Sequence, residues 1–184
     1  MSGKSPPTNL MRSLCWAEHH MTEARDGCDH LLSLSAIDPH LEHCIGSGIV
    51  ICYARPFTAN NGISCLPAKF RQFRNTGMQD VHNAVMEARD MIYAHLDMRK
   101  EPKHLPYRLS MAERNAVSIQ IRPNGECKWT VPRHALSRSM LKPIMDLCEF
   151  QSARLHEDSS KMFAHLCTGK IFKPGNYTLG VGFP

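Results

Sequence analysis

Apolar residues recur at helical spacing over most of this 184-residue chain, and this periodicity limits the possible folds more than any other feature. The clearest segment covers about residues 78–97. Its apolar positions follow the i, i+3, i+4, i+7 pattern of one helix face: Val81, Ala84, Val85, Ala88, Met91 and Ile92, with His95 in the same register. Pro102 and Pro106 prevent this helix from continuing far beyond Lys100.

Three other segments predict helices, over about residues 7–35, 39–54 and 137–166. The first is one long helix, or two helices with a break at Gly27. The second begins with an N-cap, Asp38, followed by Pro39 at the first helical position.

The period changes to two in the region before the last helix, which predicts a β-hairpin at about residues 115–131. Alternating strands flank the turn residues Pro123-Asn124-Gly125. The sequence therefore predicts a mainly α fold, a bundle of four or five helices. We expect a single domain over residues 1–184, with the hairpin inserted at about 107–134 and a C-terminal tail from about 169.

The supply of metal-ligand side chains is unusual, with 11 His and 8 Cys. The chain has no Cys-x-x-Cys pair, and His40-x-x-His43 lacks a matched downstream pair, so we expect neither a metal nor a cofactor. A small metal-binding sensor stays as an alternative. Without a secretory signal or a membrane-length apolar run, the chain is expected to be cytoplasmic, with reduced cysteines and no contact with a membrane.

The positive charge is concentrated outside the first 50 residues. The whole chain carries a net charge of +5, but its first 50 residues hold three basic and six acidic side chains, so the rest holds 19 and 11. Basic residues flank the clearest helix, with Phe70 and Phe73 among them. Cations interleaved with aromatic rings are typical of single-stranded RNA binding, whereas the alternative places both rings in the core.

The clearest helix contains Arg89-Asp90-Met-Ile-Tyr93-Ala-His95. In an ideal α-helix, Arg89 and His95 are about 9 Å apart along the axis and about 120° apart around it. They therefore flank the apolar stripe, and a cleft at its border would receive both side chains. The alternative is that His95 is a hydrogen-bonded histidine of the stripe and Arg89 a surface cation.

This stretch resembles the Arg-x(4–6)-His motif of the HEPN superfamily, including Asp90 after the arginine and Ala94 before the histidine. The segment Tyr53-Ala-Arg55-Pro56-Phe57 is similar to a pattern in uncharacterised bacterial members. The resemblance implies a HEPN-like helical bundle, often a homodimer, whose catalytic members are metal-independent endoribonucleases acting in stress or phage defence, with an antitoxin or other regulatory partner.

The resemblance assigns His95 as general base or acid and Arg89 as the phosphate-binding cation, and Asp90 as the residue that orients the histidine or arginine or caps the partner helix. Cleavage by attack of the ribose 2′-OH requires such groups. Further RNA contacts are expected from seven residues near the motif: Arg55, Lys69, Arg71, Arg74, Tyr93, Arg99 and Lys100. The alternative is a non-catalytic module of the same fold that binds RNA or a protein partner. Where one toxin branch carries the tyrosine that is modified, this chain has Asp97, so control by adenylylation is not expected.

Overall fold

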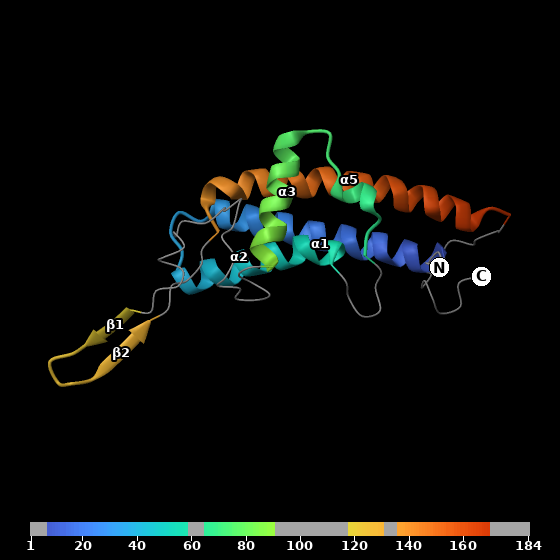
Figure 1. Ribbon diagram of the computed structural model, residues 1–184. Helices are drawn as coiled ribbons and strands as arrows, with labels where there is room; N and C mark the ends of the chain where they lie inside the picture. Colours follow the sequence, from blue (N-terminus) through green and yellow to red (C-terminus); the bar gives the residue numbers. More distant parts are fainter. Residues whose placement is uncertain (1–6, 59–64, 91–117, 131–135, 170–184) are drawn as a thin grey trace.

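The computed structural model describes residues 7–58, 65–90, 118–130 and 136–169, and within these ranges the protein is mainly helical with one two-stranded sheet (Figure 1). The two longest helices, α1 (Pro7–Ser33) and α5 (Arg138–Cys167), lie antiparallel and side by side. Helix α2 (Pro39–Ala54) packs on α1, and α3 (Thr76–Ala88) crosses α5. This arrangement confirms the predicted helical bundle with a hairpin.

Two short 3-10 helices, η1 (Arg55–Phe57) and η2 (Ala68–Arg71), lie between α2 and α3 along the chain. Arg71 joins them, because its Nη2 donates a hydrogen bond to the carbonyl of Phe57 over 2.6 Å. A backbone bond of 2.9 Å from Leu66 N to Pro56 O brings the two segments together as well. No helix in the described ranges combines the length and apolar character that crossing a bilayer requires.

Helix α1 is continuous through Gly27, so of the two expectations for this segment the single long helix is confirmed. A Cβ at Gly27 would lie 2.8 Å from Ile49 Cγ1 on α2. The absence of a side chain therefore allows the two helices to approach closely. The glycine is a packing feature of α1 rather than a helix breaker.

Side chains satisfy the backbone groups at the ends of three helices. Asp38 accepts hydrogen bonds from the first turn of α2, the shorter of them 2.8 Å from His40 N. Asn75 accepts from Gly77 N at 2.9 Å and so caps α3. At the C-terminus of α1, Arg138 of α5 donates to the carbonyl of Leu31 over 2.7 Å. A cation at this helix end also interacts favourably with the helix dipole.

The predicted hairpin is present as β1 (Ser118–Ile121) and β2 (Cys127–Thr130), paired antiparallel with Ile119 opposite Trp129. Gly125 has φ +81° in the turn, a conformation that favours glycine. The hairpin projects from the end of the bundle where α2 and α5 begin (Figure 1).

The hydrophobic core lies between α1, α5 and the elements that cover them. The predicted stripe of α1 is buried at Leu14, Ala17, Met21 and Ala24, and Val85 and Ala88 bring α3 into the same cluster. Fully burying a leucine or valine side chain stabilises a fold by about 1.5–3 kcal/mol. The largest fully buried side chains belong to α1, α2, η2 and α5 and to Leu136: Tyr53, Phe70, Leu14, Met21, Ile49, Leu136, Leu141, Ile144, Leu147, Leu155, Gln151 and Val50.

One polar pair lies inside this core. The hydroxyl of Tyr53 on α2 is 2.8 Å from Nδ1 of His82 on α3, and both residues are buried. Phe57 packs edge-on against the imidazole, with ring centroids 4.9 Å apart. Burial, with a smaller effect of the nearby Arg71 charge, lowers the pKa of His82 to about 4. His82 is therefore neutral at pH 7.

The low pKa of His82 predicts that the folded protein becomes less stable as the pH falls. Between pH 6.5, the ordinary pKa of histidine, and about 4, the unfolded chain binds a proton that the folded chain does not. The contribution of His82 to the free energy of unfolding is thus complete above pH 6.5 and decreases, by at most about 1.4 kcal/mol per pH unit, as the pH falls through this range. Urea unfolding at pH 7, 6 and 5 measures the loss.

The variant His82→Gln keeps an acceptor for the Tyr53 hydroxyl, and its unfolding free energy should depend less on pH between 7 and 5. The control is His40→Gln at an exposed position of α2, which should keep the wild-type pH dependence. Equal pH dependence in wild type and His82→Gln would contradict the assignment.

Candidate nucleic-acid interface

The most distinctive surface feature is a guanidinium group surrounded by aromatic rings. Arg154 of α5 has its Cζ 5.2 Å from the ring centroid of Phe70, 5.4 Å from that of Phe150 and 5.8 Å from that of Phe73. Phe150 and Arg154 are four residues apart on α5 and so share a helix face. Each such cation–π contact contributes about 0.5–1 kcal/mol at exposed sites.

Hydrogen bonds fix the orientation of this guanidinium. Arg154 Nη2 donates to the carbonyl of Lys69 over 2.7 Å, and Nη1 donates to Gln151 Oε1 over 3.1 Å. The amide of Gln151, itself fully buried, donates to the carbonyl of Phe70 over 2.6 Å. Arg154 and Gln151 therefore join α5 to η2.

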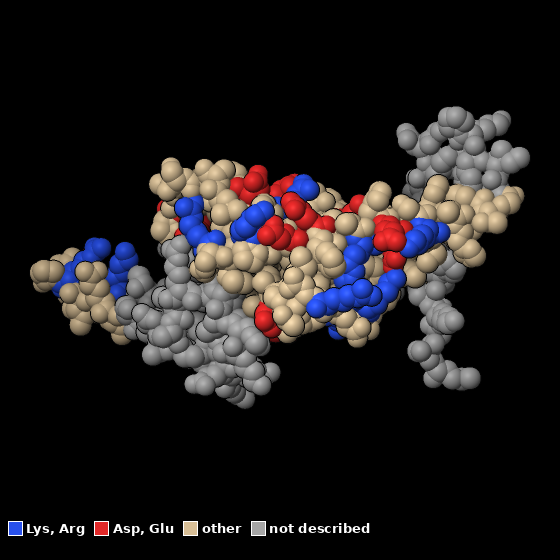
Figure 2. All heavy atoms as spheres, turned by 90° about the horizontal axis from the view of Figure 1, so that it is seen from above, with Lys and Arg blue, Asp and Glu red and all other residues tan. Residues whose placement is uncertain are grey.

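Arg154 lies in a groove of about 860 Å³ between η2, the start of α3 and the middle of α5. This volume is within the range of small-molecule binding sites. Figure 2 shows Lys and Arg side chains on both halves of the face seen from above, with the largest group on the right half and carboxylates among them. The groove is lined by polar, charged and aromatic residues: Lys69, Gln72, Phe73, Arg74, Asn75, Met78, Phe150, Arg154 and Glu157. We call this surface the arginine–phenylalanine groove.

The charges of the groove favour an anion. Its one carboxylate, Glu157, is ion-paired with Lys161, and Lys69 is ion-paired with Asp158. Arg74 is exposed and has no ion-pair partner in the described part of the chain. The N-terminus of α3, which begins after Asn75, adds the positive end of a helix dipole.

The structure brings together two of the cations predicted to bind RNA, Lys69 and Arg74, in this groove. Arg71 is close in sequence, but Nη2 of its guanidinium donates a hydrogen bond to the carbonyl of Phe57. Arg55, the C-cap of α2, is exposed and lies near Cys52. Burial raises the pKa of the Cys52 thiol, and the positive charge of Arg55 acts against this rise. Phe70 is a core residue, as the alternative held, whereas Phe73 is only half-buried.

Arg89 and Asp90 follow α3 directly in a π-helical turn. Arg89 Nη1 and Asp90 Oδ1 form an ion pair of 2.6 Å, in which the arginine side chain keeps 27% of its exposure. The other predicted residues of the motif and its flank, Tyr93, His95, Arg99 and Lys100, lie outside the described residues.

The groove and the Arg89-Asp90 pair lie at opposite ends of α3. The N-terminus of α3, at Thr76, lies on one side of α5, and its C-terminal end lies toward α1 and α2 (Figure 1). At 1.5 Å per residue, Arg89 is about 20 Å along the helix from Thr76. Lys69 and Arg74 are therefore about one helix length away from Arg89.

Sequence reasoning missed Arg154 and Phe150. The only signal was the i, i+4 spacing of an aromatic residue and an arginine, which also occurs on ordinary surface helices. It missed a second cluster as well, in which His20 and Glu23 of α1 lie beside Cys52 of α2. Comparison of the chain with protein-family models, with curated protein sequences and with solved structures found no match.

Proposed function

We propose that this protein binds single-stranded RNA in the arginine–phenylalanine groove. The observation that carries the proposal is the position of Arg154 over three phenylalanine rings in a groove of about 860 Å³. Single-stranded RNA presents unstacked bases and phosphates together, so it is bound by aromatic faces set among cations. Phe150 and Phe73 would stack with bases, and Arg154 and Arg74 would bind phosphate.

The same features argue against two other ligand classes. A duplex keeps its bases stacked inside, so the aromatic rings of the groove would gain few contacts with them. A small apolar ligand would not need Arg74, Lys69 and Arg154 around it. The preference for RNA over single-stranded DNA rests on the HEPN resemblance.

Replacing Phe150 by alanine should weaken RNA binding about 5- to 150-fold, because stacking on an aromatic side chain contributes about 1–3 kcal/mol per base. Phe150 is 40% exposed, so its removal should leave most of the core intact. The measurement is fluorescence anisotropy with a labelled single-stranded oligouridine, with duplex RNA and single-stranded DNA as competitors. The matched control is Phe163→Ala, on the same helix, 46% exposed and outside the groove lining.

Charge is tested separately with Arg74→Ala and the exposed control Lys142→Ala. Only the former should weaken binding and reduce the slope of log K against log salt, by about one. Equal effects of Phe150→Ala and Phe163→Ala, or no binding by the wild type, would overturn the groove assignment.

RNA cleavage is a second candidate function, favoured by the π turn at Arg89–Asp90. Turns of this kind are rare and occur often at functional sites. We propose that Arg89 binds the scissile phosphate, Asp90 orients Arg89, and His95 transfers the proton. In this reaction the 2′-oxygen bonds to phosphorus and the 5′-oxygen leaves with a proton, which gives a 2′,3′-cyclic phosphate end. Strand cleavage would then occur about one helix length from the groove.

Wild-type protein in EDTA should cleave single-stranded RNA and leave 2′,3′-cyclic phosphate ends. His95→Ala should slow cleavage by at least about 100-fold, the lower range of general acid–base catalysis. Arg89→Ala should slow it as well, whereas His40→Ala at an exposed position of α2 should not. Product ends are identified by gel mobility before and after acid treatment.

A folded wild type that binds RNA in the groove but does not cleave it would leave the binding module as the function. The HEPN resemblance also implies a homodimer with both Arg89–His95 pairs in one cleft. Light scattering that gives only 20.8 kDa, the mass of one chain, would count against this arrangement.

A further inference from the structure

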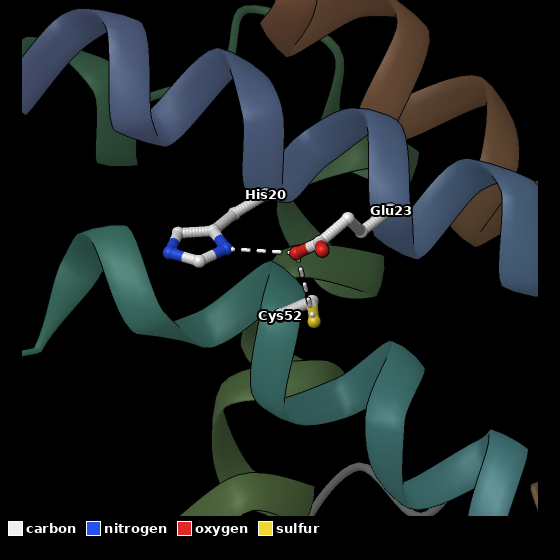
Figure 3. Close-up of side chains that lie close together, drawn as sticks. All are labelled: His20, Glu23 and Cys52. Carbon is white, nitrogen blue, oxygen red and sulfur yellow. Dashed lines mark hydrogen bonds and ion pairs between the residues drawn. The ribbon is translucent and has the colours of Figure 1, made fainter.

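Three ligand-type side chains from two helices meet on the side of α1 that α2 covers (Figure 3). Glu23 Oε2 is 3.1 Å from His20 Nδ1 and 3.6 Å from Cys52 Sγ. Within the described ranges, this is the only such group of three His, Cys, Asp or Glu residues, and its nitrogen, oxygen and sulfur atoms all lie within 4.8 Å of one another.

These separations are close to those of a tetrahedral zinc site. Zinc binds sulfur at about 2.3 Å and nitrogen or carboxylate oxygen at about 2.0–2.2 Å. Tetrahedral angles then place the nitrogen and oxygen ligands about 3.4 Å apart and the sulfur about 3.5 Å from either. Small side-chain rotations of Glu23 and Cys52 would bring all three atoms to these separations.

The kinds of donor atom select the metal. Thiolate and imidazole favour zinc or another late transition metal over Mg²⁺ and Ca²⁺, which prefer oxygen ligands. A carboxylate completes a set in which all three groups are ordinary zinc ligands.

The surroundings orient the cluster before any ion arrives. His20 is buried, and its ring lies 5.9 Å from that of Trp16. His19 Nε2 lies 3.3 Å from Glu23 Oε1, the carboxylate oxygen that does not face the other two groups. A partner on the second oxygen fixes a metal-binding carboxylate and typically strengthens metal binding about 10- to 100-fold.

We propose that His20, Glu23 and Cys52 form a Zn²⁺ site with three protein ligands and one position open to water. On binding, the sulfur–hydrogen bond of Cys52 breaks, a sulfur–zinc bond forms and the proton goes to solvent. Zinc must displace the thiol proton, because cysteine binds a metal as the thiolate. The bound ion would join α1 to α2 and stabilise the bundle. The site is independent of the proposed RNA groove.

The test uses the full-length protein, freed of metal with a chelator, and Zn²⁺ or Co²⁺ alone as probe. Calorimetric titration should show one Zn²⁺ per chain and a higher thermal midpoint in its presence. Co²⁺ should give the near-ultraviolet charge-transfer band of a thiolate ligand. Cys52→Ser should abolish this band and weaken Zn²⁺ binding by more than about tenfold, because loss of a ligand costs at least as much as loss of its supporting partner.

The matched control is Cys44→Ser, an exposed cysteine on the same helix, which should keep both the band and the affinity. Glu23→Gln retains a hydrogen-bonding side chain in place of the carboxylate and should weaken Zn²⁺ binding without unfolding the protein. The proposal is overturned if the wild type binds no Zn²⁺, or if Cys52→Ser binds it as tightly as Cys44→Ser does. Neither result bears on RNA binding, which is measured separately by fluorescence anisotropy.

Discussion

The antiparallel packing of α1 on α5 is the contact on which the other parts of the structure depend. The two helices share an apolar seam that includes Leu14 and Met21 on one side and Ile144 and Leu155 on the other. The seam fixes which face of α5 points outward, and Phe150 and Arg154 lie on that face. Helices α2 and α3 and the 3-10 segments then pack against a pair of helices that already has a defined orientation.

The helices were predictable because their apolar residues repeat at the helical period. Asp38-Pro39 marked the start of α2, and the alternation around Gly125 marked the hairpin. Gly27 was ambiguous, since a glycine in a helical pattern fits either a break or a close helix contact. Only the position of Ile49 on α2 decides between them.

The candidate groove was only partly predictable. Lys69 and Arg74 stood out because cations and aromatic residues cluster in that stretch, but their partner Arg154 lies 80 or more residues further along the chain. The hydrogen bond from Arg154 to the carbonyl of Lys69 forms only when the helices pack, so no local sequence pattern indicates it. The His20–Cys52 cluster was hidden for the same reason, because the spacing rules for metal motifs describe ligands that are near in sequence.

Arg89 and the groove lie at the two ends of α3, and a helix of this length is stiff. The distance between them is therefore set by the number of residues between Thr76 and Arg89. An RNA strand that reached both would have to follow α3. If the protein binds and cleaves RNA as proposed, this separation would allow single substitutions to dissociate the two activities.

The buried pair of Tyr53 and His82 is connected to the surface. Gln151 hydrogen-bonds the Tyr53 side chain and also holds Arg154, so a chain of polar contacts runs from the interior to the groove. A ligand that binds Arg154 where these hydrogen bonds hold it binds the folded state and not the unfolded chain, and so stabilises the fold by mass action. It should therefore slow amide hydrogen exchange in α2 and α3 around this pair, although no ligand atom touches either residue. Hydrogen exchange in the interior of the bundle would thus show whether a ligand occupies the arginine–phenylalanine groove on its surface.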